Sequence, residues 1–209
     1  MENIELEEKD LSVWTTEAED LLANWSEKAS GYRWLHDRME KKYRRRYYAF
    51  SIPVIVFSTL TGTANFGMDS YVSEENKSTA TAIVGGFNIA CGILGTLQNF
   101  LRLAENMENH RVSGVAWSKL QRSIQIELSL DCCRRSPCCD FLNICRAEYD
   151  RLIEQSPLIS DEIIQLFKRR FKDYDIAVPS ICNGLDKITI FRCGEKKVEE
   201  EVKEEIEIP

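Results

Sequence analysis

Charged side chains are missing from two long stretches of this 209-residue sequence. No Asp, Glu, Lys or Arg occurs from Tyr47 to Phe66 or from Ala80 to Leu101. At about 1.5 Å per residue, each stretch is about 30 Å long as a helix, which matches the hydrocarbon thickness of a bilayer. A soluble core rarely contains two such runs, so a buried helical hairpin is the less favoured alternative. The sequence therefore predicts two transmembrane helices.

Signatures of catalysis and nucleotide binding are missing as well. The only histidines are His36 and His110, and neither has an acid and a nucleophile close to it in the sequence. There is no HExxH zinc motif, Walker loop or GxGxxG fingerprint. The predicted spans contain no charge that could relay protons, and TLTGTANFG lacks the ordered TVGYG of a potassium filter. We therefore expect neither an enzyme nor a proton-coupled transporter, and we expect no cofactor and no nucleic-acid partner.

Basic residues are concentrated on one side of the first predicted span. Residues 33–46, RWLHDRMEKKYRRR, contain seven Lys or Arg, whereas the connecting segment 67–79 contains only Lys77. By the positive-inside rule, both termini are expected in the cytosol. The predicted fold is an all-α membrane protein, a two-helix transmembrane hairpin whose long helices extend into a cytosolic helical region. The expected segments are an N-terminal cytosolic amphipathic helix (1–46), transmembrane helices at 47–66 and 80–101, a short non-cytosolic loop (67–79), a cytosolic helical region (102–175), and an irregular segment with an acidic disordered tail (176–209).

Hydrophobic residues recur every three or four positions outside the spans. The pattern from Trp14 to Tyr43 predicts a helix that begins near Thr15 or Thr16 and runs into the first span, where Pro53 could kink it. A second pattern, 102–130, predicts that the second membrane helix continues without a break, with Gly114 as a weak point. DCCRRSPCCD then ends this helix, and shorter helices are expected at about 140–155 and 160–173.

One side of each predicted span is small and polar, and the opposite side is apolar. The pattern emerges when residues are placed at about 100° intervals around a helix. The two stripes could pack the spans against each other, because small residues let helices approach closely. Alternatively, one stripe could face a water-filled path in an oligomer. The stripe residues are Ser51, Ser58, Gly62 and Asn65 in the first span, and Thr81, Gly85, Asn88, Gly92, Gly95 and Asn99 in the second.

Charged residues lie directly outside both ends of the spans. Asp69, Glu74 and Glu75 could form an acidic ring at the outer mouth of a pore. At the inner end, Arg44, Arg45 and Arg46 could repel cations, although binding to anionic lipid headgroups is the favoured interpretation.

Four of the eight cysteines form a cluster, Cys132, Cys133, Cys138 and Cys139. The cluster contains no CxxC pair, so it is weak support for a zinc site, and no metal is expected. Disulfides are uncommon in the predicted cytosolic location. S-palmitoylation is a further alternative, and plain reduced thiols are the default interpretation.

Three stretches together resemble the SLATT family, two-helix membrane proteins associated with nucleotide-signalling modules in bacterial conflict systems, with relatives in large DNA viruses. They are YRWLHDRMEKKYRRRYYAFSIPVIVFSTLTGTANFG, GTLQNFLRLAENMENHRVSGVAWSKL and EYDRLIEQSP. The resemblance covers roughly residues 14–172 and implies a pore-forming or membrane-perturbing effector with a helical cytosolic part. We therefore expect a homo-oligomeric ion channel or pore that interacts with copies of itself, membrane lipids and ions. The alternative is a non-conducting scaffold or membrane-remodelling protein.

Overall fold

The computed structural model describes residues 13–183, and every element in that range is helical. The all-α prediction is therefore confirmed for this part of the chain. The acidic tail and most of the irregular segment expected at 176–209 lie outside the described residues. The elements are α2 (Thr16–Tyr71), α3 (Glu74–Phe100), α4 (Leu103–Leu128), the 3-10 helix η1 (Cys132–Arg134), α5 (Cys138–Gln155), α6 (Asp161–Arg170) and α7 (Ser180–Asn183).

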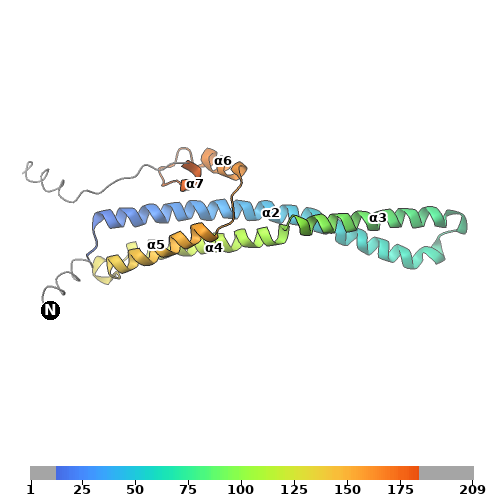
Figure 1. Ribbon diagram of the computed structural model, residues 1–209, viewed down its shortest axis with the longest axis horizontal. Coiled ribbons are helices and arrows are strands. Elements are labelled where there is room, and N and C mark those ends of the chain that lie inside the picture. Colours follow the sequence, from blue (N-terminus) through green and yellow to red (C-terminus); the bar gives the residue numbers. More distant parts are fainter. Residues whose placement is uncertain (1–12, 184–209) are drawn as a thin grey trace, which may run out of the picture.

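Helix α2 is 56 residues long and includes the first charge-free stretch. Its N-cap is Thr15, whose side chain accepts a hydrogen bond from the Ala18 N–H at 3.3 Å. Pro53 lies inside the helix and has no N–H to donate to the Ala49 carbonyl. The helix nevertheless continues, and Figure 1 shows its apolar half inclined to its first half, as a proline in a helix favours.

The second charge-free helix does not continue into α4, contrary to the sequence-based expectation. Arg102 has a left-handed backbone conformation, with φ 47° and ψ 41°, and separates α3 from α4. The following turn is stabilised by Asn106, whose side-chain amide donates to the Leu101 carbonyl at 3.3 Å. No glycine or proline marks this position, so the break has no signature in the sequence. Gly114, the predicted weak point, lies within an unbroken α4.

The connection between α2 and α3 is shorter than the expected loop at 67–79. Only Val72 and Ser73 separate the two helices, and the Val72 N–H donates to the Met68 carbonyl. The charge pattern marks where the apolar sequence ends, whereas the helices continue through polar residues on both sides of the turn. The hairpin tip is therefore helical almost to its end.

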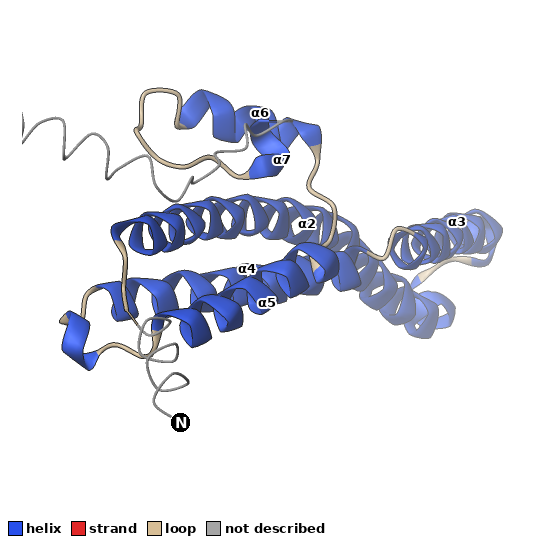
Figure 2. Cartoon of the chain, turned by 60° about the vertical axis from the view of Figure 1, so that its left-hand side comes forward, coloured by secondary structure: helices blue, strands red, loops and turns tan. Residues whose placement is uncertain are grey.

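Antiparallel packing of α2 against α4 forms the core of a helical body that also includes α5, α6 and α7 (Figure 2). Trp117 of α4 is fully buried and stacks on Tyr32 of α2, with ring centroids 4.5 Å apart. Tyr149 of α5 meets the same indole edge-on at 5.2 Å. The indole N–H donates to the Ser156 hydroxyl at 3.0 Å, so this large side chain is both packed and hydrogen-bonded.

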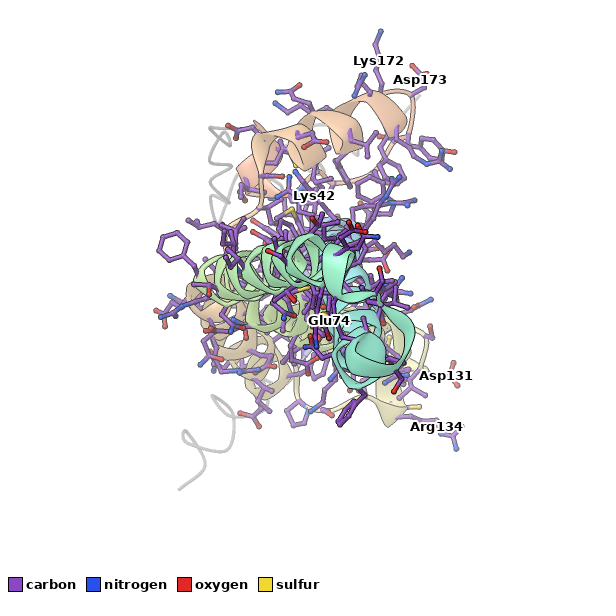
Figure 3. All side chains as sticks on the ribbon, turned by 90° about the vertical axis from the view of Figure 1, so that its right-hand side faces the viewer. Lys42, Glu74, Asp131, Arg134, Lys172 and Asp173 are labelled. Carbon is purple, nitrogen blue, oxygen red and sulfur yellow. The ribbon has the colours of Figure 1, made fainter. Side chains whose placement is uncertain are left out.

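Helices α6 and α7 lie against the first half of α2. Lys42 donates to the Glu162 carboxylate at 2.5 Å and to the Ser160 hydroxyl at 3.3 Å. Figure 3 shows Lys42 on the side of the body that carries α6. Gly31 is buried under the Pro179 ring, which anchors the segment leading into α7. These contacts place α6 and α7 beside α2 and away from the hairpin tip.

The apolar hairpin, which we define as residues 47–101, extends from one end of the helical body (Figure 1). Two helices are long and apolar enough to cross a membrane, and only 6% of each apolar window is buried within the chain. A soluble protein would bury such helices in its core. This exposure disfavours the soluble alternative and leaves most of the hairpin surface open to lipid or to other chains.

Candidate functional site

The two arms of the apolar hairpin contact each other along one line. The contacts run in opposite directions along α2 and α3, so the arms are antiparallel. They are the Ser51–Gln98 hydrogen bond (3.1 Å), the Cys91 thiol near the Val54 carbonyl (4.0 Å), the Phe57–Phe87 ring pair (5.2 Å), the Thr61–Asn88 hydrogen bond (2.8 Å) and the Thr81 hydroxyl near the Met68 sulfur (3.2 Å).

Thr61 and Asn88 form the central polar contact between the arms. Thr61 is only 6% exposed, and its hydroxyl lies 2.8 Å from both the Phe57 carbonyl and the Asn88 side-chain oxygen. A hydroxyl has one proton, so it fully serves one of these acceptors at a time. Rotating the Asn88 amide would let its NH2 group donate to Thr61 while Thr61 donates to Phe57. Thr61 was not among the predicted stripe residues.

The predicted stripes coincide only in part with this line of contact. On α2, the contacting residues Val54, Thr61 and Met68 lie about 70° around the helix from Ser58, Gly62 and Asn65. A similar offset of about 90°, in the same rotational sense, separates Cys91 and Gln98 from the stripe of α3. Because the arms are antiparallel, similar offsets turn both stripes toward the same side. The hairpin therefore has one continuous polar face, formed by Ser58, Gly62, Asn65, Gly85, Gly92 and Asn99.

Three other stripe residues lie at the contact between the arms, since Ser51, Thr81 and Asn88 make the contacts described above. Gly95 is half-buried. By contrast, Ser58, Asn65, Gly92 and Asn99 are exposed. Opposite the polar face lies an apolar face, formed by Val56, Leu60, Ala64, Ile83 and Ala90.

The glycines of the hairpin are not required for packing within one chain. A Cβ atom added at Gly62, Gly85, Gly92 or Gly95 would meet nothing within 4 Å. Glycine inside a helix costs about 1 kcal/mol relative to alanine, and close packing of α2 on α3 does not explain that cost. The same positions leave room for the backbone of another helix to approach the polar face.

The charged residues at the two ends differ in their alignment with the polar face. Glu74 is 91% exposed and forms a 3.5 Å ion pair with Lys77. It lies in line with the polar-face residues of α3, whereas Glu75 is rotated about 100° away. Figure 3 shows Glu74 at the tip of the hairpin. The side chain of Asp69 lies outside the described part of the chain.

Arg44, Arg45 and Arg46 are all exposed at the inner end of the charge-free stretch. Consecutive residues point about 100° apart, so the three guanidinium groups surround α2. Only Arg44 is in line with the polar face, and it lies 3.6 Å from the Glu40 carboxylate.

The cysteine cluster lies at the far end of the helical body from the hairpin (Figure 1). Helix α4 separates it from Arg102 by 26 residues, or about 39 Å. A lipid attached there would not reach a bilayer crossed by the hairpin, so palmitoylation onto that bilayer is disfavoured. Burial raises the pKa of the Cys145 thiol to about 11 and also raises the pKa of Cys138. Within residues 13–183 no three His, Cys, Asp or Glu side chains are grouped for metal binding.

The sequence did not predict the contact between His36 and His110. His36 and His110 were considered separately, yet their Nδ1 atoms lie 2.9 Å apart in the α2–α4 interface. Their positions held a signal, because His36 follows Tyr32 by four residues and His110 follows Met107 by three, within the apolar patterns. Those spacings indicate burial, although they cannot show that the two rings meet.

The fold and the hairpin define an all-helical protein with two helices able to cross a membrane. No protein-family model matches the sequence, and no solved structure matches it. The chain is 30% identical over 77 residues to the "Uncharacterized protein VP11" of Micromonas pusilla reovirus (isolate Netherlands/2005). That match covers 35% of this chain and 38% of the viral protein. The SLATT resemblance therefore stays a prediction.

Proposed function

We propose that the chain is a two-span integral membrane protein that assembles with copies of itself and conducts ions along the polar faces of its hairpins. The two charge-free stretches would cross the bilayer, with the helical body and both termini in the cytosol. Support for this orientation comes from the seven Lys and Arg of residues 33–46, against the single Lys77 in residues 67–79.

The observation that carries the proposal is the single exposed polar face. In a lone hairpin, the amides of Asn65 and Asn99 would face hydrocarbon, where an unsatisfied polar group costs several kcal/mol. If several copies turned their polar faces toward a common axis, these amides could hydrogen-bond to water or to one another. The apolar faces would then meet lipid. This arrangement uses both surfaces of the hairpin.

The ends of such a path would be charged. Glu74, in line with the polar face, would lie at the outer mouth, and Arg44 at the inner mouth would be partly offset by Glu40. Arg45 and Arg46 point away from the path and are suited to anionic lipid headgroups. The ions and lipids proposed as partners therefore engage different sides of the same helices.

A non-conducting scaffold is the second candidate. It is favoured by the Thr61–Asn88 and Ser51–Gln98 hydrogen bonds, which use part of each stripe to join the arms. In a scaffold, the polar faces of neighbouring copies would pack without water between them.

Ion flux across liposomes containing the full-length chain separates the two candidates. Asn65→Leu adds an apolar group on the polar face, and the matched control Ala64→Leu adds bulk on the apolar face one residue away. Gly92→Leu and Ala90→Leu form a second pair on α3. Asn88 is a poorer test position, because its replacement also removes the bond to Thr61.

A channel predicts that Asn65→Leu and Gly92→Leu reduce or abolish flux, whereas the controls retain it. Equal flux from all four variants would contradict conduction along the polar face. Liposomes that stay tight around oligomers of the unmodified chain, with assembly lost in Asn65→Leu and Gly92→Leu, would favour the scaffold.

A further inference from the structure

His36 of α2 and His110 of α4 form a buried pair. The side chains are 0% and 1% exposed, and their Nδ1 atoms are 2.9 Å apart. The Tyr43 ring stacks on His110, with centroids 5.5 Å apart. Gly114 of α4 lies against His36, and a Cβ atom there would be in ordinary van der Waals contact with the His36 Cβ, at 3.5 Å. The pair therefore joins the two helices inside their packed interface.

The geometry determines which nitrogen atoms carry the two protons of the neutral pair. A 2.9 Å contact between two Nδ1 atoms requires one proton between them, with one ring as donor and the other as acceptor. The Nε2 atom of His36 is buried without a partner. A buried N–H without an acceptor is costly, so we assign His36 as the Nδ1–H donor with a bare Nε2. His110 then accepts at Nδ1 and carries its own proton on Nε2.

The pair lies close to the boundary between the helical body and the apolar hairpin. His110 follows the left-handed Arg102 by eight residues (110 − 102), and His36 precedes Arg44 by eight (44 − 36). Helix α2 is continuous from His36 into the hairpin, whereas the α3–α4 arm is broken at Arg102. A change in α2–α4 packing at the pair would therefore act directly beside the break.

Solvent can approach the pair from one side. His110 lines a surface cavity of about 270 Å³ together with Gly114 and the charged residues Arg33, Asp37, Glu40 and Arg111. The charged groups of the other packed helices are engaged elsewhere: Arg151 of α5 pairs with Glu148, and Glu162 of α6 pairs with Lys42. Protons therefore have a route to the rings through this cavity.

We propose that the His36–His110 pair is an acid-sensitive latch, which holds α2 against α4 while both rings are neutral and releases them when both are protonated. Double protonation places N–H groups on both Nδ1 atoms, so no lone pair remains between them. It also puts two positive charges about 3 Å apart in a buried site, where charges repel strongly. The contact cannot persist in that state.

Burial lowers the pKa of His110 to about 4, and burial together with the charge of His110 lowers the pKa of His36 to about 4. Well above pH 6.5, both rings are neutral in the closed and in the open interface. Below it, the open interface binds protons first, so closure weakens as pH falls and levels off below about 4. Between pH 7 and 4 the opening equilibrium should rise by about a hundredfold for each ring.

The chain has only two histidines, so NMR of protein labelled with 15N in the imidazole rings reports on this pair alone. The full-length chain in lipid nanodiscs should show one Nδ1–H and one Nε2–H tautomer at pH 7. We expect both rings to stay neutral between pH 8 and 5. They should become protonated near pH 4, and the amide protection factors of α2 and α4 should fall at the same pH. Titration of both rings near pH 6.5, or protonation without a fall in amide protection, would overturn the latch.

A doubly substituted chain, His36→Asn with His110→Asn, separates the latch from general acid unfolding. Two amides can replace the single bridge and do not titrate in this range. The variant should keep its amide protection at pH 4, whereas loss of protection at the same pH as the unmodified chain would contradict the proposal. If the variant does not fold, the wild-type tautomer and titration measurements still decide the outcome. None of these readouts depends on ion conduction.

Discussion

Two glycines inside helices of the body should respond to alanine in opposite directions. At Gly31, an added Cβ would overlap the Pro179 ring, lying 2.7 Å from its Cδ atom, and would crowd Phe167 at 3.4 Å. Pro179 is fully buried and its ring cannot rotate away. At Gly114, the nearest atom would be the His36 Cβ at 3.5 Å, an ordinary van der Waals contact.

The magnitudes follow from two competing effects. Alanine gains about 1 kcal/mol over glycine in a helix interior, and overpacking a core costs about 1–3 kcal/mol. Because the clash at Gly31 involves a rigid buried ring, we expect Gly31→Ala to destabilise the body by about 1–2 kcal/mol. Gly114→Ala should retain most of the helix gain and stabilise it by up to about 1 kcal/mol.

Thermal unfolding of the full-length chain in detergent measures both signs. For a chain of this size, 1 kcal/mol corresponds to about 2–4 °C in Tm. Limited trypsin digestion adds a local readout at the exposed Lys172, since Gly31→Ala should displace Pro179, loosen the segment between them and speed cleavage there. A higher Tm for Gly31→Ala, with cleavage after Lys172 no faster than in the unmodified chain, would refute the reasoning about the Pro179 contact.

Three further predictions concern other parts of the chain. Trp117→Ala should lower the free energy of unfolding by about 3–5 kcal/mol in thermal or denaturant melts, because it leaves a cavity and an unpaired Ser156 hydroxyl. Arg102→Gly should raise it by about 1 kcal/mol, because glycine adopts the left-handed conformation without the Cβ penalty; an unchanged or lower melting point would argue against strain there. In the proposed channel, Glu74→Gln should shift the reversal potential toward the equilibrium potential of the anion, because it removes a negative charge from the outer mouth. The control Glu75→Gln should leave the reversal potential unchanged, and equal shifts in both variants would contradict the assigned polar face.

Helix positions were predictable because apolar periodicity and capping act locally. The pattern beginning at Trp14 and the cap at Thr15 both appear in the structure, and α5 and α6 lie near their expected ranges. The break at Arg102 was not predictable. No residue type near Arg102 indicates a left-handed backbone there. The break lies between α3 and α4, which both pack on α2, so it depends on tertiary packing and not on local sequence.

The polar stripes were predictable as sets of residues, but their direction was not. Helical spacing shows that Ser58, Gly62 and Asn65 share one side of α2, and it cannot show what that side meets. The direction in which the stripe faces depends on which residues form the α2–α3 contact. Thr61 contacts Asn88 there and Cys91 contacts Val54, and neither pairing can be deduced from the spacing within one helix. The contact line thus fixes the orientation of the polar face.

The continuity of α2 and the break at Arg102 together decide how motion in the body can reach the hairpin. An unbroken helix transmits rotation along its axis, whereas a break absorbs it. Helix α2 packs on α4 at one end and on α3 at the other, and only the α3–α4 arm is interrupted. A change at His36–His110 can therefore turn α2 relative to α4 without forcing α3 to follow α4. Within the hairpin, such a turn would act first on the Ser51–Gln98 contact, the α2–α3 hydrogen bond described above that lies closest in sequence to the break.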